Sequence, residues 1–249
     1  MTDRQPDDFK GKLAVVTGAS RGIGRALALA LATRGAHVVA VARTVGALEE
    51  LDDAINAVGG QATLVPLDLT DYDGIDRLGG AINERWGKLD ILVGNAGILG
   101  PLSPLGHVEP KAFEEVLAVN VTANWRLIRS LDPLLRLSEA GRAVFVTSAA
   151  ARKCTAYWGP YATSKAALEA LARTYAAETR NISPVRVMLV NPGPLRTAMR
   201  HIAMPGEDPA TLKTPEDFVP NVLRFLTPAS QDSGQLYDFQ SDTVIRFAS

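Results

Sequence analysis

The stretch that decides the fold reads Leu13-Ala14-Val15-Val16-Thr17-Gly18-Ala19-Ser20-Arg21-Gly22-Ile23-Gly24. Its apolar first part predicts a short buried strand, and residues 25–34 predict a helix. Glycines between a strand and a helix let the backbone bend and come close to a pyrophosphate, while the helix N-terminus offers free N–H groups. The spacing is G-x-x-x-G-x-G, so the stretch predicts a phosphate-binding turn; the alternative is an ordinary turn, where glycines are frequent.

The same alternation of strand and helix continues along the chain. Further strands are predicted at residues 36–42, 62–67, 89–93, 142–147, 185–190 and 235–240, and further helices at 46–58, 71–86, 109–137, 161–178 and from 214 onward, where Thr214 is a plausible cap and Pro215 the first helical residue. This order predicts an α/β fold, a doubly wound, Rossmann-type parallel sheet of about seven strands with helices on both faces. The length of 249 residues, 47% of them hydrophobic, fits a single domain over residues 1–249.

Composition excludes several classes of function. A net charge of −1 without a long basic run argues against nucleic acid as a partner. The single cysteine, Cys154, allows no intramolecular disulfide and offers no metal cluster. The polar N-terminus and the lack of a long apolar run argue against a signal peptide and a membrane span, so we expect a cytoplasmic protein.

A second stretch carries acid–base chemistry. Ser148 follows the apolar run of residues 143–147, at the carboxyl end of a predicted strand, and Tyr161 and Lys165 are four residues apart on the next helix. An ammonium beside a phenol lowers the phenol's pKa, and a serine hydroxyl can hold a reacting oxygen. The trio therefore predicts proton transfer to or from an alcohol oxygen; an ordinary surface pair at helical spacing is the alternative.

The residues just after the other strands describe a binding site, because ligands bind at the carboxyl ends of parallel strands. An acid after the second strand would bind the ribose 2′-hydroxyl of NAD, but Arg43 stands there and residues 41–44 contain no acid. A guanidinium at this point, with Arg21 in the glycine-rich turn, suits a 2′-phosphate. The sequence therefore predicts that NADP(H) is preferred over NAD(H).

Three segments are expected to form the walls of a substrate pocket, residues 98–107, 149–158 and 194–213. They are rich in Leu, Pro, Ala and Met, which predicts a largely apolar substrate, and Arg152 and Lys153 suit an anionic end. Residues 195–213 are interpreted as a lid over this pocket, with irregular packing as the alternative. Cys154 is interpreted as a small side chain near the pocket.

Taken together, these motifs resemble the short-chain dehydrogenase/reductase family, in its short single-domain branch, over residues 9–240. The turn at residues 17–24, the Asn95-Ala96-Gly97 loop, and Pro192-Gly193 with Thr197 match the family's cofactor segments. Asn120, Ser148, Tyr161 and Lys165 occur in the order of its catalytic tetrad. The region from residue 194 to 215 is also similar to a subgroup of poorly characterised bacterial oxidoreductases.

The resemblance implies a role for each matched residue. Tyr161 would exchange a proton with the substrate oxygen, Lys165 would lower the pKa of Tyr161, Ser148 would hold the oxygen, and Asn120 would position a water. The residues implied in binding the cofactor are Gly18, Ser20, Arg21, Gly22, Ile23, Gly24, Arg43, Asp68, Leu69, Asn95, Ala96, Gly97, Tyr161, Lys165, Pro192, Gly193, Leu195 and Thr197. Asp68 and Leu69 would line the adenine site, and Asn95 would support the end of the sheet.

The resemblance implies an NADP(H)-dependent enzyme that interconverts a small-molecule carbonyl and alcohol by hydride transfer. An epimerase or dehydratase that recycles its bound nucleotide is a second hypothesis, although longer relatives of that kind carry a C-terminal substrate domain that this chain lacks. A nucleotide-sensing regulator is a third, although such proteins typically lose the tyrosine or the lysine. A homotetramer or homodimer, formed through the two long helices near Asn120 and Tyr161, is also expected.

Overall fold

The computed structural model describes residues 8–247. Its strands are β1 (Leu13–Thr17), β2 (His37–Ala42), β3 (Gln61–Pro66), β4 (Ile91–Gly94), β5 (Arg142–Val146), β6 (Arg186–Asn191), β7 (Gln235–Asp238) and β8 (Thr243–Ile245). Its helices are α1 (Gly22–Thr33), α2 (Val45–Ala57), α3 (Tyr72–Trp86), α4 (Pro110–Leu117), α5 (Ala123–Arg136), α6 (Ala150–Lys153), α7 (Gly159–Thr179), α8 (Ala198–Ala203) and α9 (Pro215–Leu226). Two 3₁₀ turns, η1 (Leu105–His107) and η3 (Pro209–Thr211), and a π-helical turn, η2 (Ala118–Thr122), complete the elements.

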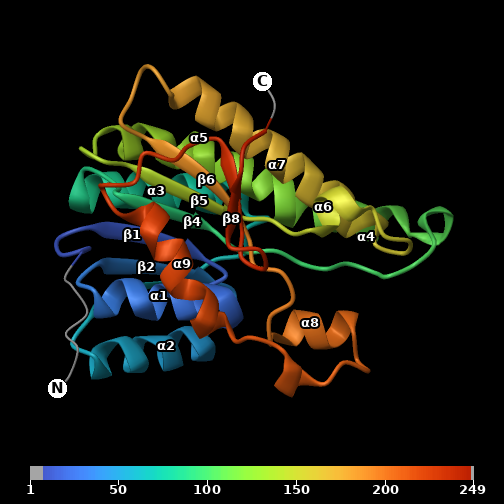
Figure 1. The fold of residues 1–249 in the computed structure, drawn as a ribbon. Helices are drawn as coiled ribbons and strands as arrows, with labels where there is room; N and C mark the ends of the chain where they lie inside the picture. The colour runs from blue at the N-terminus through green and yellow to red at the C-terminus, as the bar shows by residue number, and fades with distance from the viewer. Residues whose placement is uncertain (1–7, 248–249) are drawn as a thin grey trace.

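All the strands form one sheet in the order β3-β2-β1-β4-β5-β6-β7-β8 (Figure 1). The pairs from β3 to β7 are parallel, which confirms the predicted doubly wound, Rossmann-type sheet. An additional strand that was not predicted, β8, pairs antiparallel with β7 at one edge. The strand order reverses between β1 and β4, so their carboxyl ends diverge into a crevice where ligands bind in such sheets.

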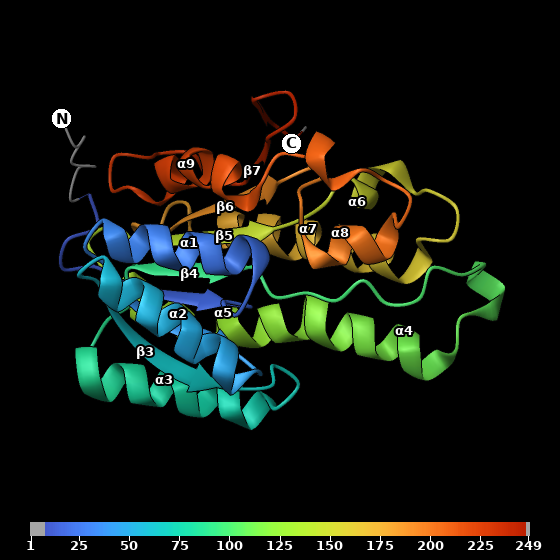
Figure 2. The ribbon, with the colours of Figure 1, turned by 90° about the horizontal axis from the view of Figure 1, so that it is seen from below.

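Each face of the sheet is covered by helices that bury an apolar core against it. Figure 1 shows α1, α2 and α9 on one face and α3, α5 and α7 on the other, and Figure 2 looks onto α1 and α2. The core under α1 includes Leu27 and Leu31, and the core under α5 includes Leu127 and Leu131; all four are fully buried. Because both faces are covered, the central strands are continuous apolar runs rather than alternating ones.

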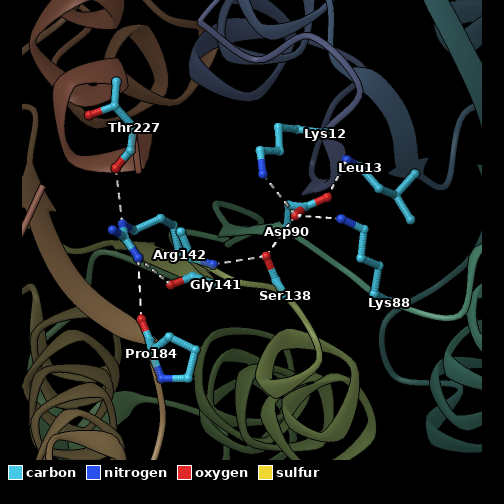
Figure 3. A network of polar contacts seen from close by, with 10 residues as sticks. Lys12, Leu13, Lys88, Asp90, Ser138, Gly141, Arg142, Pro184 and Thr227 are labelled. Carbon is cyan, nitrogen blue, oxygen red and sulfur yellow. Dashed lines mark hydrogen bonds and ion pairs between the residues drawn. The ribbon is translucent and has the colours of Figure 1, made fainter. Parts of the chain in front are cut away.

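The amino end of the sheet is held by two buried charged side chains (Figure 3). Asp90, before β4, accepts hydrogen bonds from the backbone N–H of Leu13 at 3.0 Å and from the hydroxyl of Ser138 at 2.6 Å. The ammonium groups of Lys12 and Lys88 lie 3.5 and 3.4 Å from the same carboxylate. Burial lowers the pKa of Arg142 to about 10, and its guanidinium donates to backbone carbonyl oxygens, among them that of Pro228 at 2.7 Å. These bonds lie at the end of the sheet opposite the crevice, so we assign them to stability.

One predicted helix is divided in the structure, and the segment interpreted as a lid, whose role stays a prediction, has structure of its own. The helix expected over residues 109–137 is divided into α4 and α5 by the π-helical turn η2, which contains Asn120. The segment expected as a lid contains a helix, α8, and its ends are joined by a backbone bridge between Leu195 and Lys213. The start of α9 agrees with its prediction, since Thr214 caps the helix in a capping box with Asp217. No helix between residues 8 and 247 has the length and apolar character needed to cross a membrane.

Candidate functional site

A cavity of about 420 Å³ lies at the carboxyl ends of β4, β5 and β6. The predicted site residues that line it are Ile23, Asn95, Gly97, Ser148, Tyr161, Lys165, Pro192, Gly193, Leu195 and Thr197. The cavity thus gathers one residue of the glycine-rich turn, the loop after β4, the serine–tyrosine–lysine trio and the segment after β6. These segments are far apart in the sequence, and the strand order brings them together.

The glycine-rich turn packs tightly against the loop after β4. Gly18 has a φ of 65°, and a Cβ there would lie 2.8 Å from the Nδ2 of Asn95. A Cβ on Gly24 would collide with the carbonyl oxygen of Gly18. The Nδ2 of Asn95 donates to the carbonyl oxygen of Thr17 at 2.9 Å, and the Thr17 hydroxyl accepts from the Asn95 N–H at 3.0 Å. These contacts require glycines in the turn and hold the ends of β1 and β4 together.

The first turn of α1 suits an anionic group. Its N-cap residue, Arg21, makes no side-chain capping bond, and the first turn contains no acid. The helix N-terminus therefore keeps free N–H groups and the positive end of its dipole. Gly22 has a φ of 55°, and a Cβ there would lie 3.6 Å from Thr197, so any side chain would narrow the space between α1 and the segment after β6. A dinucleotide pyrophosphate fits these features.

Tyr161 is 8% exposed at the cavity wall, where the first turn of α7 holds it beside Trp158. Burial raises the pKa of Tyr161 to about 12, and the Ser148 hydroxyl counters this rise only in part. Lys165 does not offset this rise, and its expected lowering of the pKa of Tyr161 stays a prediction. A phenol in this state is protonated at neutral pH and can donate a proton to a substrate oxygen.

Lys165 is almost completely buried, one helical turn after Tyr161, and its ammonium lies 5.6 Å from the Tyr161 ring centroid. It donates a hydrogen bond to the carbonyl oxygen of Val146 at 2.8 Å. Burial lowers the pKa of Lys165 to about 8, while the carboxylate of Glu169 opposes that fall. Because this pKa is close to neutral pH, small changes in the charges around Lys165 change the fraction of the lysine that is protonated.

Asn120 does not line the cavity but lies fully buried behind it. Its Oδ1 accepts from the N–H of Ile98 at 2.8 Å, and its Nδ2 donates to the Ile98 carbonyl oxygen at 2.9 Å and to Ser164 at 2.9 Å. The side-chain amide thus joins η2 to the loop after β4 and to α7. These contacts hold the loop after β4 against α7, and the expected role in positioning a water stays a prediction.

The residues expected around the adenosine lie at the ends of β2 and β3. The guanidinium of Arg43 is 3.6 Å from the carboxylate of Asp68, and both side chains are exposed. The carboxylate of Asp68 accepts from the N–H and the hydroxyl of Thr70, and the backbone bond contributes most to lowering its pKa. Leu69 is buried in the apolar core, so only its backbone could border an adenine. Arg21 is exposed, and Ser20 and Ala96 are half-buried beside the turn.

The segment after β6 closes one side of the cavity. Met199, Arg200, Ala203 and Met204 of the 195–213 segment line it, and Met199 and Ala203 pack on the apolar cluster that contains Tyr161. The guanidinium of Arg200 donates two hydrogen bonds to Glu207, at 2.6 and 2.7 Å. The segment therefore packs through α8 and is braced by its own ion pair.

Sequence reasoning missed several residues at this site. Gln240 lines the cavity from the turn after β7, and a Cβ on Gly193 would lie 2.5 Å from its Cγ. The sequence did contain a signal for Gln240, since this residue lies at the carboxyl end of a predicted parallel strand, where ligands bind. Glu169 was missed because a glutamate in a helix usually faces solvent, whereas this one is 6% exposed and accepts from Thr147.

The chain is similar in sequence and in fold to known oxidoreductases. The family model of the short chain dehydrogenases matches residues 12–208. The chain is 37% identical to the uncharacterised oxidoreductase YciK of Escherichia coli K12, over 94% of each chain. A crystal structure of a short chain dehydrogenase from Shigella flexneri 2a, complexed with NADP, superimposes with a TM-score of 0.91 at 36% identity, covering 95% of this chain and all of that one. An uncharacterised NAD-dependent oxidoreductase of Mycobacterium tuberculosis is 36% identical over 76% of this chain and 73% of its own length. The chain therefore belongs to the short-chain dehydrogenase/reductase family of NAD(P)-dependent oxidoreductases.

Proposed function

We propose that this protein interconverts a carbonyl and an alcohol with NADP(H), and that Tyr161 exchanges the proton with the substrate oxygen. The observation that carries the proposal is the position of the Tyr161 phenol, in the wall of one cavity together with Ser148 and Lys165. The nicotinamide, when bound, supplies or accepts the hydride. The protein's own residues orient the reactants and manage the proton.

In the direction of reduction, each of the three side chains has a separate task. The Ser148 hydroxyl hydrogen-bonds to the carbonyl oxygen, which holds the oxygen at the phenol. Tyr161, protonated because burial raises its pKa to about 12, donates the proton. Lys165 presents a positive charge one turn away, which stabilises the phenolate left behind. Asn120 holds the loop after β4 in place beside this group.

The preference for NADP(H) is supported by Arg43, whose exposed guanidinium follows β2, and by Arg21 at the start of α1. The Shigella flexneri structure is described as a complex with NADP. The relative from Mycobacterium tuberculosis is described as NAD-dependent, so the choice depends on this chain's own residues. Of these, we assign Arg43 to the 2′-phosphate, where an acid would repel it.

The lining of the cavity supports a largely apolar substrate. Leu99, Ala150, Trp158, Met199 and Met204 contribute apolar walls. The charged residues of the lining are all cations, namely Lys153, Lys165 and Arg200. Lys165 is buried and Arg200 is bonded to Glu207, whereas Lys153 makes no ion pair within residues 8–247. We therefore assign Lys153 to an anionic end of the substrate.

The test of the proposed function is a panel of ketones, aldehydes and 3-oxoacyl thioesters offered with NADPH. Net consumption of NADPH supports the proposal. A bound nucleotide that is recycled without net consumption would instead favour an epimerase or dehydratase. Nucleotide binding without turnover of any carbonyl would favour a sensor.

We also propose that the chain is a single domain that assembles as a homodimer or homotetramer through α5 and α7. The support is Trp125 on α5, which is 44% exposed although large and apolar. Light scattering after size-exclusion chromatography tests this, and Trp125→Glu is expected to shift the protein toward the monomer.

A further inference from the structure

Three side chains on one face of α7 point to the catalytic strand end. Tyr161, Lys165 and Glu169 follow one another at intervals of four residues, so they share a face of the helix. The first two belong to the catalytic trio, and Glu169 has no part in the mechanism above. It is a buried acid, 6% exposed, and a carboxylate removed from water needs compensating partners. Its position beside the trio suggests that the partners are part of the site.

The contacts of Glu169 and Lys165 converge on the end of β5. The ammonium of Lys165 donates to the carbonyl oxygen of Val146 at 2.8 Å. The hydroxyl of Thr147 donates to the carboxylate of Glu169 at 2.9 Å. Val146 and Thr147 are the two residues before Ser148, so α7 fixes successive points of the segment that presents the catalytic hydroxyl.

We propose that Glu169 is a positioning residue of the active site, which fixes Thr147 and thereby Ser148, and which keeps the ammonium of Lys165 charged in its buried position. This inference rests on the proposed function, in which Lys165 acts as a cation. Glu169 touches neither the substrate nor the reacting atoms and acts through Thr147 and Lys165.

The charges around the pair are few and can be named. Lys165 is surrounded by α7 itself, which contributes Glu169 and the phenol of Tyr161, and by η2, which contributes the neutral Asn120. Glu169 faces Lys165 and Arg173 on α7 and Arg152 on α6, and Arg152 also lies 3.8 Å from Asp238. Burial raises the pKa of Glu169, whereas the Thr147 bond and the three cations lower it. Glu169 is the acid that opposes the fall in the pKa of Lys165 caused by burial.

Two substitutions separate the two tasks. Glu169→Gln keeps an oxygen that can accept from Thr147 but removes the charge. Thr147→Val keeps the charge but removes the bond. Glu169→Asp keeps the charge on a shorter side chain, and Glu178→Gln removes an exposed acid from the same helix as the matched control.

The measurement is the pKa of Lys165 in each ligand-free protein, from an NMR titration of labelled lysine side chains assigned with Lys165→Met, combined with the pH dependence of kcat/KM. Side chains four residues apart on a helix are neighbours, and an opposite charge within about 4–6 Å typically changes a pKa by about 1 or more. In Glu169→Gln the pKa of Lys165 should therefore fall by about one pH unit. The value of kcat/KM should fall about fivefold near pH 8 but less than about twofold near pH 6, in proportion to the charged lysine. Glu169→Asp should restore the wild-type pH profile.

Thr147→Val should lower kcat without moving the pH profile, and Glu178→Gln should change neither quantity. A pKa of Lys165 that is the same in wild type and Glu169→Gln would overturn the inference. So would a pH profile that shifts equally in Glu178→Gln. If the wild type reduces no carbonyl compound, the proposed function fails, and the NMR titration still decides whether Glu169 controls the charge of Lys165.

Discussion

The guanidinium of Arg43 lies 3.6 Å from the carboxylate of Asp68, just past the carboxyl ends of the neighbouring strands β2 and β3. Both side chains are exposed, and such surface pairs contribute little to stability, so Arg43 can turn toward a phosphate at small cost. Hydrogen bonds to charged groups contribute about 1.5–3 kcal/mol. Arg43→Ala should therefore cut the NADPH-over-NADH preference in kcat/KM by roughly 10- to 150-fold.

Asp68→Asn is the matched control for this prediction. It keeps the oxygen that accepts from Thr70 but removes the carboxylate that competes for Arg43. We expect it to raise the preference for NADPH while Arg43→Ala lowers it. NADH should change little in Arg43→Ala, whereas the loss of an adenine contact in Asp68→Asn would weaken both cofactors alike and leave the ratio to report on Arg43. Cofactor titrations on the three proteins decide, and an unchanged ratio in Arg43→Ala would remove Arg43 from the cofactor site.

Lys153 predicts selectivity between charged and neutral substrates. Its side chain is exposed at the cavity and free of ion pairs within the described chain, so a substrate carboxylate could bind it. For a matched pair of ketones that differ only in a carboxylate or its methyl ester, Lys153→Ala should raise KM for the acid by about tenfold and leave the ester unchanged. Lys111→Ala, an exposed lysine on α4, is the control. Equal changes in KM for the acid and the ester would show that Lys153 does not bind the substrate carboxylate.

Replacement of Lys165 should make the protein more stable but inactive. The lysine's pKa of about 8 in the folded protein is below its ordinary value of 10.5, so the unfolded chain holds the proton more tightly between these pH values. The cost of burying the charge is complete below pH 8, declines as the pH rises toward 10.5, and is absent above it. Lys165→Met should therefore raise the free energy of unfolding at neutral pH by about 1–3 kcal/mol, after the lost bond to Val146 is deducted, while activity disappears. Urea unfolding across this pH range measures the difference. A variant less stable than wild type at neutral pH would contradict it.

At the other end of the sheet, the stability that Asp90 contributes should be lost as the pH falls. The hydrogen bonds from Ser138 and Leu13, with Lys12 and Lys88, hold its pKa below the usual value of 3.8 despite burial. Its stabilising contribution is complete above that value and is lost as the pH falls through the lower, folded pKa. Asp90→Asn should destabilise the protein by about 1–3 kcal/mol at neutral pH, since it removes the buried charge and one of the two oxygens that accept from Leu13 and Ser138. The difference from wild type should shrink in acid, and a difference that is independent of pH would show that shape rather than charge matters here.

The sequence was sufficient for the layout of the sheet and the location of the site. The central parallel strands, such as β1 and β6, were predictable because they are nearly continuous apolar runs. The site could be located because the carboxyl ends of parallel strands meet at one edge. The edge strand β8 was not predictable, because three residues near the end of the chain, only half-buried, carry too weak a pattern.

The departures inside the site have local causes. The π-helical turn at Asn120 was missed because residues 109–137 keep an uninterrupted helical pattern, and only the contacts of Asn120 with Ile98 and Ser164 show why the helix widens there. The pKa of Tyr161 was expected to fall next to a lysine. It rises because the phenol is buried and the lysine bonds to Val146. The spacing of the two residues in the sequence reveals neither fact.

The central claim is that Tyr161 donates the proton, and its most direct test is the turnover of a carbonyl substrate with NADPH by wild type and Tyr161→Phe. Only the hydroxyl is removed, so folding and NADPH binding should stay near wild type. A general acid typically contributes about 10²- to 10⁴-fold, so kcat should fall by at least about a hundredfold. A variant that keeps half of the wild-type kcat would show that another group supplies the proton.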